Sequence, residues 1–323
     1  MNILSLFDGM SCGRIAAERA GLTVTKYYAS EVDKYAIKVS QANWTDIIQL
    51  GDVTKWREWD IDWSSIDLLI GGSPCQGFSF AGKQLAFDDP RSKLFFVYVN
   101  ILNHIRSVNP DIKFMLENVK MKKEHLAVIS EQLGVEPVFI NSALVSAQNR
   151  QRYYWANWEF GQPEDKSVTL SDILDPNLKS CGVGARIVGR RLNELGKRED
   201  YNFSIPITQY LELRSDDKSN CMTTVYKDSV VPYFKTDKTL AIKFNQSKSS
   251  CLTGGANSGG NHSDMDILVI DPDVCRRYSV IECERLQTVP ENYTAQVSNT
   301  QRYKMLGNGW TVDVIAHIFR SMK

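Results

Sequence analysis

Short apolar runs alternate with longer segments of mixed character over the first ~155 residues, and this alternation most limits the folds open to the chain. We expect strands at residues 3–7, 27–31, 47–50, 67–70 and 114–116. Helical spacing of apolar residues lies between them, at 14–20 and 93–106. Strands that alternate with helices are typical of a parallel sheet covered by helices on both faces. We therefore predict an α/β fold with a doubly wound, mostly parallel sheet.

Glycine or polar residues stand where several predicted strands end. They are Asp8-Gly9, Glu31, Pro74-Cys75 and Glu117-Asn118. In open parallel sheets, ligands bind at the carboxyl ends of the strands. The sequence therefore predicts that these residues share one site.

The first turn, from Phe7 to Gly13, has the features of a nucleotide-binding turn. Its glycines allow close approach of the backbone to a ligand, and the following helix offers free N–H groups. Glu31 ends the next strand about 20 residues later, a spacing that suits a carboxylate bound to ribose hydroxyls. The pattern G-x-G-x-x-G is absent, which disfavours a dinucleotide. Asp52 either reaches an adenine amino group or caps a turn.

A second candidate site centres on Cys75, which lies in the loop Gly71-Gly72-Ser73-Pro74-Cys75-Gln76-Gly77. An exposed cysteine near backbone N–H donors favours the reactive thiolate, whereas most cysteines are packed in a core. Glu117 follows a neighbouring strand, and neither motif contains a histidine. This pair does not suit a cysteine protease. It suits nucleophilic addition to a ring that an acid protonates.

The amino-acid composition of the chain changes after about residue 157. We expect a strand pair at 138–144 and 152–155, and then a smaller irregular domain rich in Ser, Asn, Asp, Thr and Gly. Inside it, 218–223 and 248–253 resemble each other, either as an internal repeat or as a chance similarity of two short strands. Helices are predicted at 280–286 and 312–319. The predicted domains are 1–158 with 271–323, and 159–270.

Composition and charge exclude several classes of protein. The chain has 38 Lys+Arg and 38 Asp+Glu, so nucleic acid could be bound only through local patches. The 7 cysteines form no C-x-x-C pair and the 4 histidines are scattered, so we predict no metal and a reducing, cytoplasmic compartment. The N-terminus lacks the pattern of a signal peptide, and no apolar run reaches the roughly 18 residues of a membrane span.

Several motifs occur in the order and spacing of one family. They are Phe7-x-Gly9, Pro74-Cys75-Gln76, Glu117-Asn118-Val119, Gln148-x-Arg150-x-Arg152, Arg277 to Gln287, and Gly307-Asn308. With them the sequence resembles the DNA (cytosine-5)-methyltransferases, in a compact bacterial or phage form. The segments Ser30-Glu31-Val32 and Leu306 to Val312 resemble the de novo-type animal enzymes. The first turn departs from the Phe-Ala-Gly-x-Gly-Gly of most bacterial members.

The resemblance implies a class I S-adenosylmethionine-dependent methyltransferase fold and a role for each matching residue. Cys75 would attack C6 of a flipped cytosine, Glu117 would hold N3 and the amino group, and Arg152, with Arg150, would hold O2. Phe7 would contact adenine, Glu31 the ribose, and Asp52 the adenine amino group. The full set expected around S-adenosylmethionine is Phe7, Asp8, Gly9, Glu31, Val32, Asp52, Val53, Pro74, Asn308 and Gly309.

The middle region is predicted to read double-stranded DNA through two basic clusters. The first holds Arg186, Arg190, Arg191, Lys197 and Arg198, and the second holds Lys235, Lys238, Lys243 and Lys248. The alternative is an ordinary charged surface. Gln76, Ser79, Arg190 and Arg191 are expected to contact DNA, as is Thr253, for which Thr223 is the rival. We expect a monomer that acts on duplex DNA.

Two other functions remain compatible with these motifs. A tRNA cytosine methyltransferase of the same family would also need the cysteine and the glutamate, and a DNA-binding homologue could have lost the chemistry. Adenine methylation is disfavoured, because Ser73-Pro74-Cys75-Gln76 stands where an Asn/Asp-Pro-Pro-aromatic loop is needed.

Overall fold

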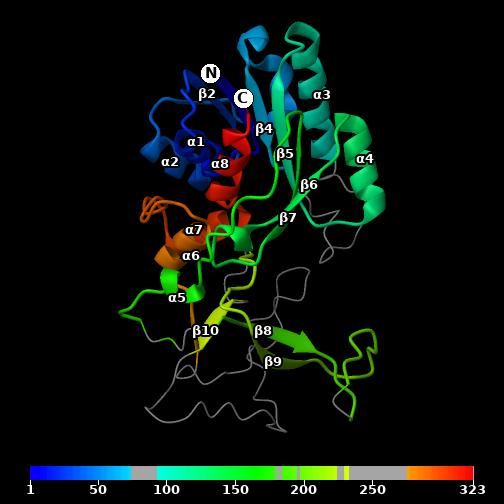
Figure 1. Ribbon diagram of the computed structural model, residues 1–323, viewed down its shortest axis with the longest axis vertical. Helices are drawn as coiled ribbons and strands as arrows, with labels where there is room; N and C mark the ends of the chain where they lie inside the picture. Colours follow the sequence, from blue (N-terminus) through cyan, green and yellow to red (C-terminus); the bar gives the residue numbers. More distant parts are fainter. Residues whose placement is uncertain are drawn as a thin grey trace.

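A seven-stranded, mostly parallel sheet forms the upper half of the molecule in the computed structural model (Figure 1). The structure describes residues 1–73, 93–178, 180, 184–194, 197–223, 229–232 and 275–322. The strand order is β3-β2-β1-β4-β5-β7-β6, with β7 antiparallel to both of its neighbours. The strands are β1 (Asn2–Leu6), β2 (Lys26–Ser30), β3 (Ile47–Gln49), β4 (Leu68–Gly71), β5 (Lys113–Val119), β6 (Val138–Asn141) and β7 (Gln151–Ala156). The predicted α/β fold is confirmed.

Alternating side chains of β1 enter two separate cores, because successive residues of a strand point to opposite faces. Ile3 belongs to one buried cluster, and Leu4 and Leu6 belong to the other. The first cluster includes side chains of α1 (Cys12–Arg19), α2 (Lys34–Asn43) and α8 (Val312–Arg320). The second includes those of α3 (Lys93–Val108), α4 (Lys123–Leu133) and the 3-10 helix η1 (Val53–Glu58). Helices therefore cover both faces of the sheet.

Local signals explain where several of these helices begin and end. The Asp33 carboxylate accepts the Tyr35 N–H at 2.9 Å and caps α2. Helix α4 ends at Leu133 and is capped by Gly134, whose φ of 76° is readily adopted by glycine. Helix α6 (Val280–Leu286) begins with a capping box between Ser279 and Glu282.

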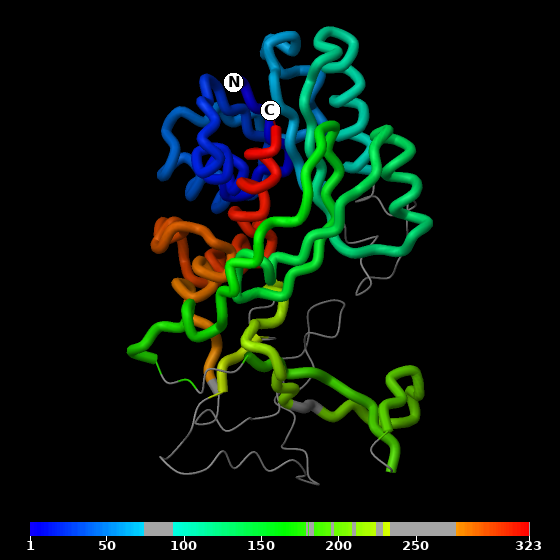
Figure 2. The backbone as a smooth tube through the Cα atoms, viewed as in Figure 1, coloured from blue at the N-terminus to red at the C-terminus, as the bar shows by residue number. Residues whose placement is uncertain are grey.

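The chain returns to the first sheet at its C-terminal end. In Figure 2, the red C-terminal segment lies against the blue N-terminal part. Helix α8 packs on α1, where Arg19 Nη1 lies 2.8 Å from Asp313 Oδ1. Residues of α8 also share a core with Ile3 of β1. Segments from the two ends of the sequence therefore build one face of the sheet.

A second sheet lies below the first and has the order β11-β10-β8-β9. Its strands are β8 (Ala185–Arg190), β9 (Thr208–Leu213), β10 (Val230–Pro232) and β11 (Cys275–Arg277). The short helices α5 (Leu170–Ile173), α6 and α7 (Asn299–Asn308) lie between the two sheets in Figure 1. Because β11 pairs with β10, this sheet extends past residue 270.

Two details of the predicted strands are wrong. The strand expected over 138–144 ends at Asn141, where the Asn141 side chain caps a 3-10 helix, η4 (Ser142–Leu144). Residues 218–223 form no regular strand and make one isolated bridge, between Ser219 and Gln148. Among the helices that the structure describes, which also include η2 (Trp63–Ser65), none has the length and apolar character needed to cross a membrane.

Candidate functional site

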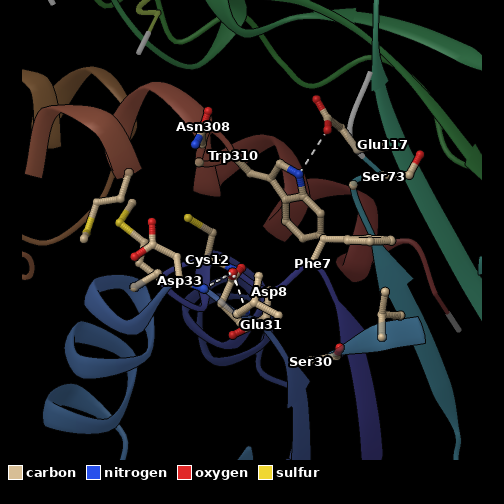
Figure 3. A pocket seen from close by; sticks show the side chains of 18 of the residues that line it. Phe7, Asp8, Cys12, Ser30, Glu31, Asp33, Ser73, Glu117, Asn308 and Trp310 are labelled. Atoms are coloured by element: carbon tan, nitrogen blue, oxygen red, sulfur yellow. Dashed lines mark hydrogen bonds between the residues drawn. The ribbon is translucent and has the colours of Figure 1, made fainter. Parts of the chain in front are cut away.

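A cavity of about 460 Å³ opens where β1, β2, β4 and β5 end (Figure 3). It lies around the β1–β4 pair, where the strand order reverses direction, which is where open α/β sheets bind ligands. The predicted cofactor residues that line it are Phe7, Asp8, Gly9, Glu31, Val32, Asp52, Val53, Asn308 and Gly309. Glu117, Arg150 and Arg152 line it as well. The sheet therefore brings residues from both predicted sites to one cavity.

The turn after β1 has an unusual backbone. Phe7, Gly9 and Ser11 have φ angles of 57°, 59° and 64°, in the left-handed region. The Asp8 carboxylate accepts hydrogen bonds from the Ser11 and Tyr27 hydroxyls, the latter at 2.8 Å. Burial raises the pKa of the Asp8 carboxyl to about 6. The Asp8 side chain therefore anchors the turn, although the residue also borders the cavity.

Glu31 is held in place by the backbone around it. Its carboxylate accepts three N–H groups, from Gly9 at 2.8 Å, Val32 at 2.7 Å and Asp33 at 2.8 Å. A carboxylate has about four lone-pair positions, so one remains for a ligand hydroxyl. The neighbouring Val32 is 70% exposed, and with Phe7 it offers apolar surface at the cavity. These features fit an adenosine group, with its flat ring and its ribose.

Asp52 caps η1, as one of its two interpretations predicted. Its carboxylate accepts the Thr54 N–H and the Thr54 hydroxyl, both at 2.8 Å. These two hydrogen bonds lower the pKa of the exposed Asp52 carboxyl. Capping does not exclude a second role, because Asp52 and Val53 both line the cavity.

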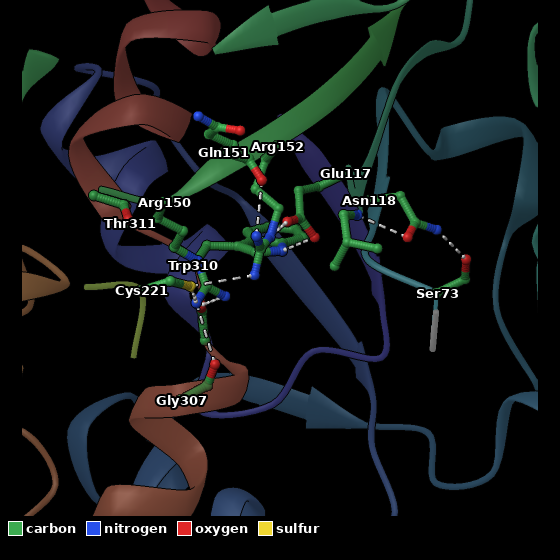
Figure 4. Close-up of polar contacts among 12 residues, drawn as sticks. Ser73, Glu117, Asn118, Arg150, Gln151, Arg152, Cys221, Gly307, Trp310 and Thr311 are labelled. Atoms are coloured by element: carbon green, nitrogen blue, oxygen red, sulfur yellow. Dashed lines mark hydrogen bonds and ion pairs between the residues drawn. The ribbon is translucent and has the colours of Figure 1, made fainter. Parts of the chain in front are cut away.

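Glu117, on β5, receives a donor on each carboxylate oxygen. Arg152 Nε lies 2.9 Å from Oε1, and the Trp310 indole N–H donates to Oε2 at 3.1 Å (Figures 3 and 4). Glu117 itself is 8% exposed. A Cβ on Gly72 would lie 2.9 Å from Trp310 Nε1 and 3.0 Å from Glu117 Oε2, so this contact requires glycine there. Such a carboxylate is positioned to meet a polar ring edge.

Arg150 and Arg152 have different environments. The buried Arg150 donates to the carbonyls of Gly309 at 2.9 Å, Met222 at 3.2 Å and Gly307 at 3.3 Å. It therefore ties the segment after α7 to residues of the middle region. Arg152 is the arginine directed at Glu117.

Sequence reasoning assigned no role to Trp310, Asp33 or Lys304. Trp310 follows the Gly307-Asn308-Gly309 turn, which marked its neighbourhood as functional. Lys304 Nζ lies 2.8 Å from Asp33 Oδ2, and both residues line the cavity. Their only signals in the sequence were closeness to Glu31 and to Asn308.

Several predicted site residues lie outside the described parts of the chain. They are Pro74, Cys75, Gln76, Ser79, Thr253 and the second basic cluster. Ser73 and Leu94, near the two ends of the 74–92 gap, both line the cavity. The Asn118 amide also donates to Ser73 Oγ at 3.3 Å.

The four arginines of the first basic cluster have internal partners in this structure. Arg186 and Arg190 both bind Glu212, at 2.6 and 2.7 Å. Arg198 pairs with Asp200, and the Arg191 guanidinium donates to the Ile205 carbonyl at 3.0 Å. The carboxylate partners offset part of the positive charge that these arginines would present to phosphate.

The chain is similar to methyltransferases over its whole length. Residues 1–323 match the family model described as C-5 cytosine-specific DNA methylase. The Type II methyltransferase M1.ScrFI of Lactococcus lactis subsp. cremoris is 30% identical over 99% of this chain and 77% of that protein. M.HhaI of Haemophilus parahaemolyticus is 25% identical over 98% of this chain and 93% of that protein.

Solved structures share the fold. The methyltransferase EhMeth of Entamoeba histolytica aligns with a TM-score of 0.63 at 16% identity, over 100% of this chain and 97% of that one. A putative DNA modification methyltransferase from an E. coli prophage aligns with a TM-score of 0.56 at 18% identity, over 100% and 98%. The predicted class I methyltransferase fold is thereby confirmed.

Proposed function

Because the chain belongs to the C-5 cytosine-specific DNA methylase family, we propose that it methylates C5 of a cytosine flipped out of a specific duplex DNA sequence. One observation carries this proposal. Glu117, gripped by Arg152 and Trp310, borders the same cavity as the Glu31 and Phe7 surface that fits an adenosine group. A ring held by Glu117 and a methyl donor held near Glu31 would therefore lie in one cavity.

S-adenosylmethionine, when bound, supplies an electrophilic methyl group. Phe7 and Val32 would pack on its adenine, Glu31 would accept a ribose hydroxyl, and Asp52 would accept the adenine amino group. Around this surface, Gly9, Val53, Pro74, Asn308 and Gly309 would complete the contacts, while Asp8 keeps the turn in shape.

The chain's own residues would activate the cytosine. The Cys75 thiolate adds to C6, forming a C6–S bond, while Glu117 donates a proton to N3 and binds the amino group. Arg152 holds O2. C5 thereby becomes electron-rich and accepts the methyl group. A base then removes the C5 proton, and the C6–S bond breaks to return the thiolate.

The region from 159 to 270 would recognise the DNA. It contains β8, β9 and β10, and the predicted contacts Arg190 and Arg191 lie at the end of β8. Gln76, Ser79 and Thr253 would add contacts next to the flipped nucleotide. We propose that a monomer acts on duplex DNA.

Trapping with 5-fluorocytosine tests the proposal. Bisulfite sequencing of a host plasmid first identifies the methylated site. A duplex with 5-fluorocytosine at that site should then form a complex that resists denaturation, because fluorine cannot leave as a cation. Cys75→Ser should form none. Glu117→Gln should trap about 10²–10⁴-fold more slowly, as expected for loss of a general acid.

The control is Cys283→Ala, which removes a thiol buried in α6 and should still trap. A stable adduct with Cys75→Ser would show that another residue is the nucleophile. Methylation of tRNA in place of duplex DNA would overturn the choice of substrate.

A further inference from the structure

Cys221 lies between the two arginines of the candidate site. Its sulfur is 3.4 Å from Arg150 Nη1 and 4.0 Å from Arg152 Nη2 (Figure 4). Arg152 also contacts Glu117, and Arg150 also binds the carbonyls on either side of Asn308. Cys221 therefore contacts both guanidinium groups that line the cavity.

The backbone fixes the position of this sulfur. The Ser219 N–H donates to the Ala147 carbonyl at 2.6 Å, and the Asn149 N–H donates to the Ser219 carbonyl at 3.0 Å. The Met222 N–H donates to the Gln148 side chain at 3.4 Å. Residues 219–222 thus run beside the segment that leads into β7, where Arg152 lies. A segment of the middle region consequently reaches the candidate site.

The charges around Cys221 favour a thiolate. Burial opposes a negative charge there, but the two guanidinium groups outweigh it and lower the pKa of the Cys221 thiol. The charged side chains that the described residues place against it are Arg150 and Arg152, with Glu117 behind Arg152. By contrast, burial raises the pKa of the Cys12 thiol to about 12. A neutral Cys221 thiol would donate to the Met222 carbonyl, 3.4 Å away, and bind the arginines weakly.

Building on the proposed function, we propose that the Cys221 thiolate is a positioning residue that holds Arg152 in place to grip Glu117 and, through it, the target cytosine. Glu117 contacts Arg152 through Nε and the thiolate lies near Nη2 of the same guanidinium, while Arg150 fixes the thiolate to the turn around Asn308. The grip on the base thereby depends on a residue of the middle region. Cys221 makes no bond to substrate in this role.

A spectroscopic titration tests whether the thiolate exists. Thiolates absorb more ultraviolet light than thiols. The difference in absorbance between the Cys75→Ser and Cys75→Ser/Cys221→Ser proteins therefore reports the ionisation of Cys221, because Cys75 is absent from both. In the folded protein, the midpoint should lie at a lower pH than in the same pair unfolded in urea. A midpoint equal to or above the unfolded one would overturn the proposal.

Kinetics test the positioning role. Cys221→Ser keeps a small hydrogen-bonding group but no charge, so kcat should fall about 10-fold at pH values where the thiolate predominates. The ratio of wild-type to Cys221→Ser kcat should shrink towards unity as the pH falls through the thiol titration. Asp8 is present in both proteins, so its titration cancels in this ratio.

The matched control is Cys283→Ser, which changes a buried thiol away from the arginines. The ratio of wild-type to Cys283→Ser kcat should not vary with pH. If the ratio of wild-type to Cys221→Ser kcat is also constant with pH, Cys221 has a merely structural role and the proposal is overturned. Because the ultraviolet titration needs no methyl transfer, failure of the proposed function would be recognised separately from failure of the thiolate.

Discussion

Glu31 and Glu117 are the same type of residue, but the structure holds them by different means. Glu31 accepts backbone N–H groups from its own turn and from the turn after β1. Glu117 is held by the side chains of Arg152 and Trp310. The first carboxylate is part of a rigid backbone cradle, whereas the second depends on side chains from distant segments.

Removing the Glu31 carboxylate should weaken cofactor binding. A charge-assisted hydrogen bond to a ribose hydroxyl is worth about 1.5–3 kcal/mol, so Glu31→Ala should lower affinity for S-adenosylmethionine about 10- to 100-fold in calorimetry. Asp33→Asn is the control, because it weakens a cavity-rim ion pair with Lys304 and should have a smaller effect. Unchanged affinity in Glu31→Ala would remove Glu31 from the cofactor site.

Asp8 should make stability depend on pH. Its folded pKa is raised from 3.8 to about 6, so its contribution is present below about pH 4 and is lost as the pH rises through 6. Between pH 4 and pH 7, wild type should lose about 2–3 kcal/mol of unfolding free energy relative to Asp8→Asn, measured in urea.

The control for Asp8 is Asp52→Asn. Because the pKa of Asp52 is lowered, its contribution to stability is present at high pH and is lost on acidification. The unfolding free energy of wild type relative to Asp52→Asn should therefore rise with pH, whereas that relative to Asp8→Asn should fall. A difference between wild type and Asp8→Asn that stays constant with pH would contradict a buried, weakly acidic Asp8.

At the scale of elements, β8 and β9 form a strand pair in which one carboxylate offsets part of the charge of two arginines. Arg186 lies opposite Glu212 in the register, and Arg190 reaches the same carboxylate from four residues further along the same face of the strand. One acid therefore holds two of the arginines that sequence analysis assigned to DNA. A phosphate that binds there would meet guanidinium groups whose charge Glu212 already offsets in part.

Removing this acid should strengthen DNA binding. Glu212→Gln frees two guanidinium groups, so the plot of log affinity against log salt should steepen by about 1–2, since each phosphate contact contributes about 0.9. Fluorescence anisotropy with a non-target duplex measures this slope. Glu199→Gln is the matched control: Glu199 lies in the connection between β8 and β9 and binds Asn193 and Asn202. Equal slopes for both variants would mean that β8 does not face DNA.

At the scale of the whole molecule, the C-terminal segment completes the cavity wall. The Tyr293 hydroxyl donates to the Met10 carbonyl at 2.8 Å, and Gln287 Nε2 donates to the Leu306 carbonyl at 2.7 Å. These contacts link the first turn, α6 and α7. The cavity is therefore built from segments at both ends of the sequence.

A chain that ends at residue 270 should lose cofactor binding and cooperative unfolding. It would lack Asn308, Gly309 and Trp310 of the cavity wall. It would also lack α8, so the surface of α1 that α8 covers would be exposed. Calorimetry with S-adenosylmethionine and urea unfolding followed by circular dichroism measure the two losses. Adding residues 271–323 as a separate chain should restore binding in part. A truncated protein that binds cofactor and unfolds cooperatively would contradict this account.

Sequence alone determined the features that depend on neighbouring residues. The alternation of apolar runs predicted the sheet, because burial on both faces needs continuous apolar strands. The family resemblance is confirmed by the match over residues 1–323. The turn from Phe7 and the carboxylate of Glu31 were recognisable because each forms within a few residues of a strand end. Local geometry and local sequence coincide at these positions.

Tertiary structure alone decided the contacts between distant residues. Trp310 donates to Glu117 across 193 positions, and Arg150 reaches Cys221 across 71. The tertiary structure also shows that Arg186 and Arg190 share Glu212. Two residues of a basic cluster in the sequence are therefore ion-paired with an acid in the folded molecule. Periodicity reports which face a residue occupies within its own element. It carries no information about which other element packs there, since that follows from the simultaneous burial of all the apolar faces.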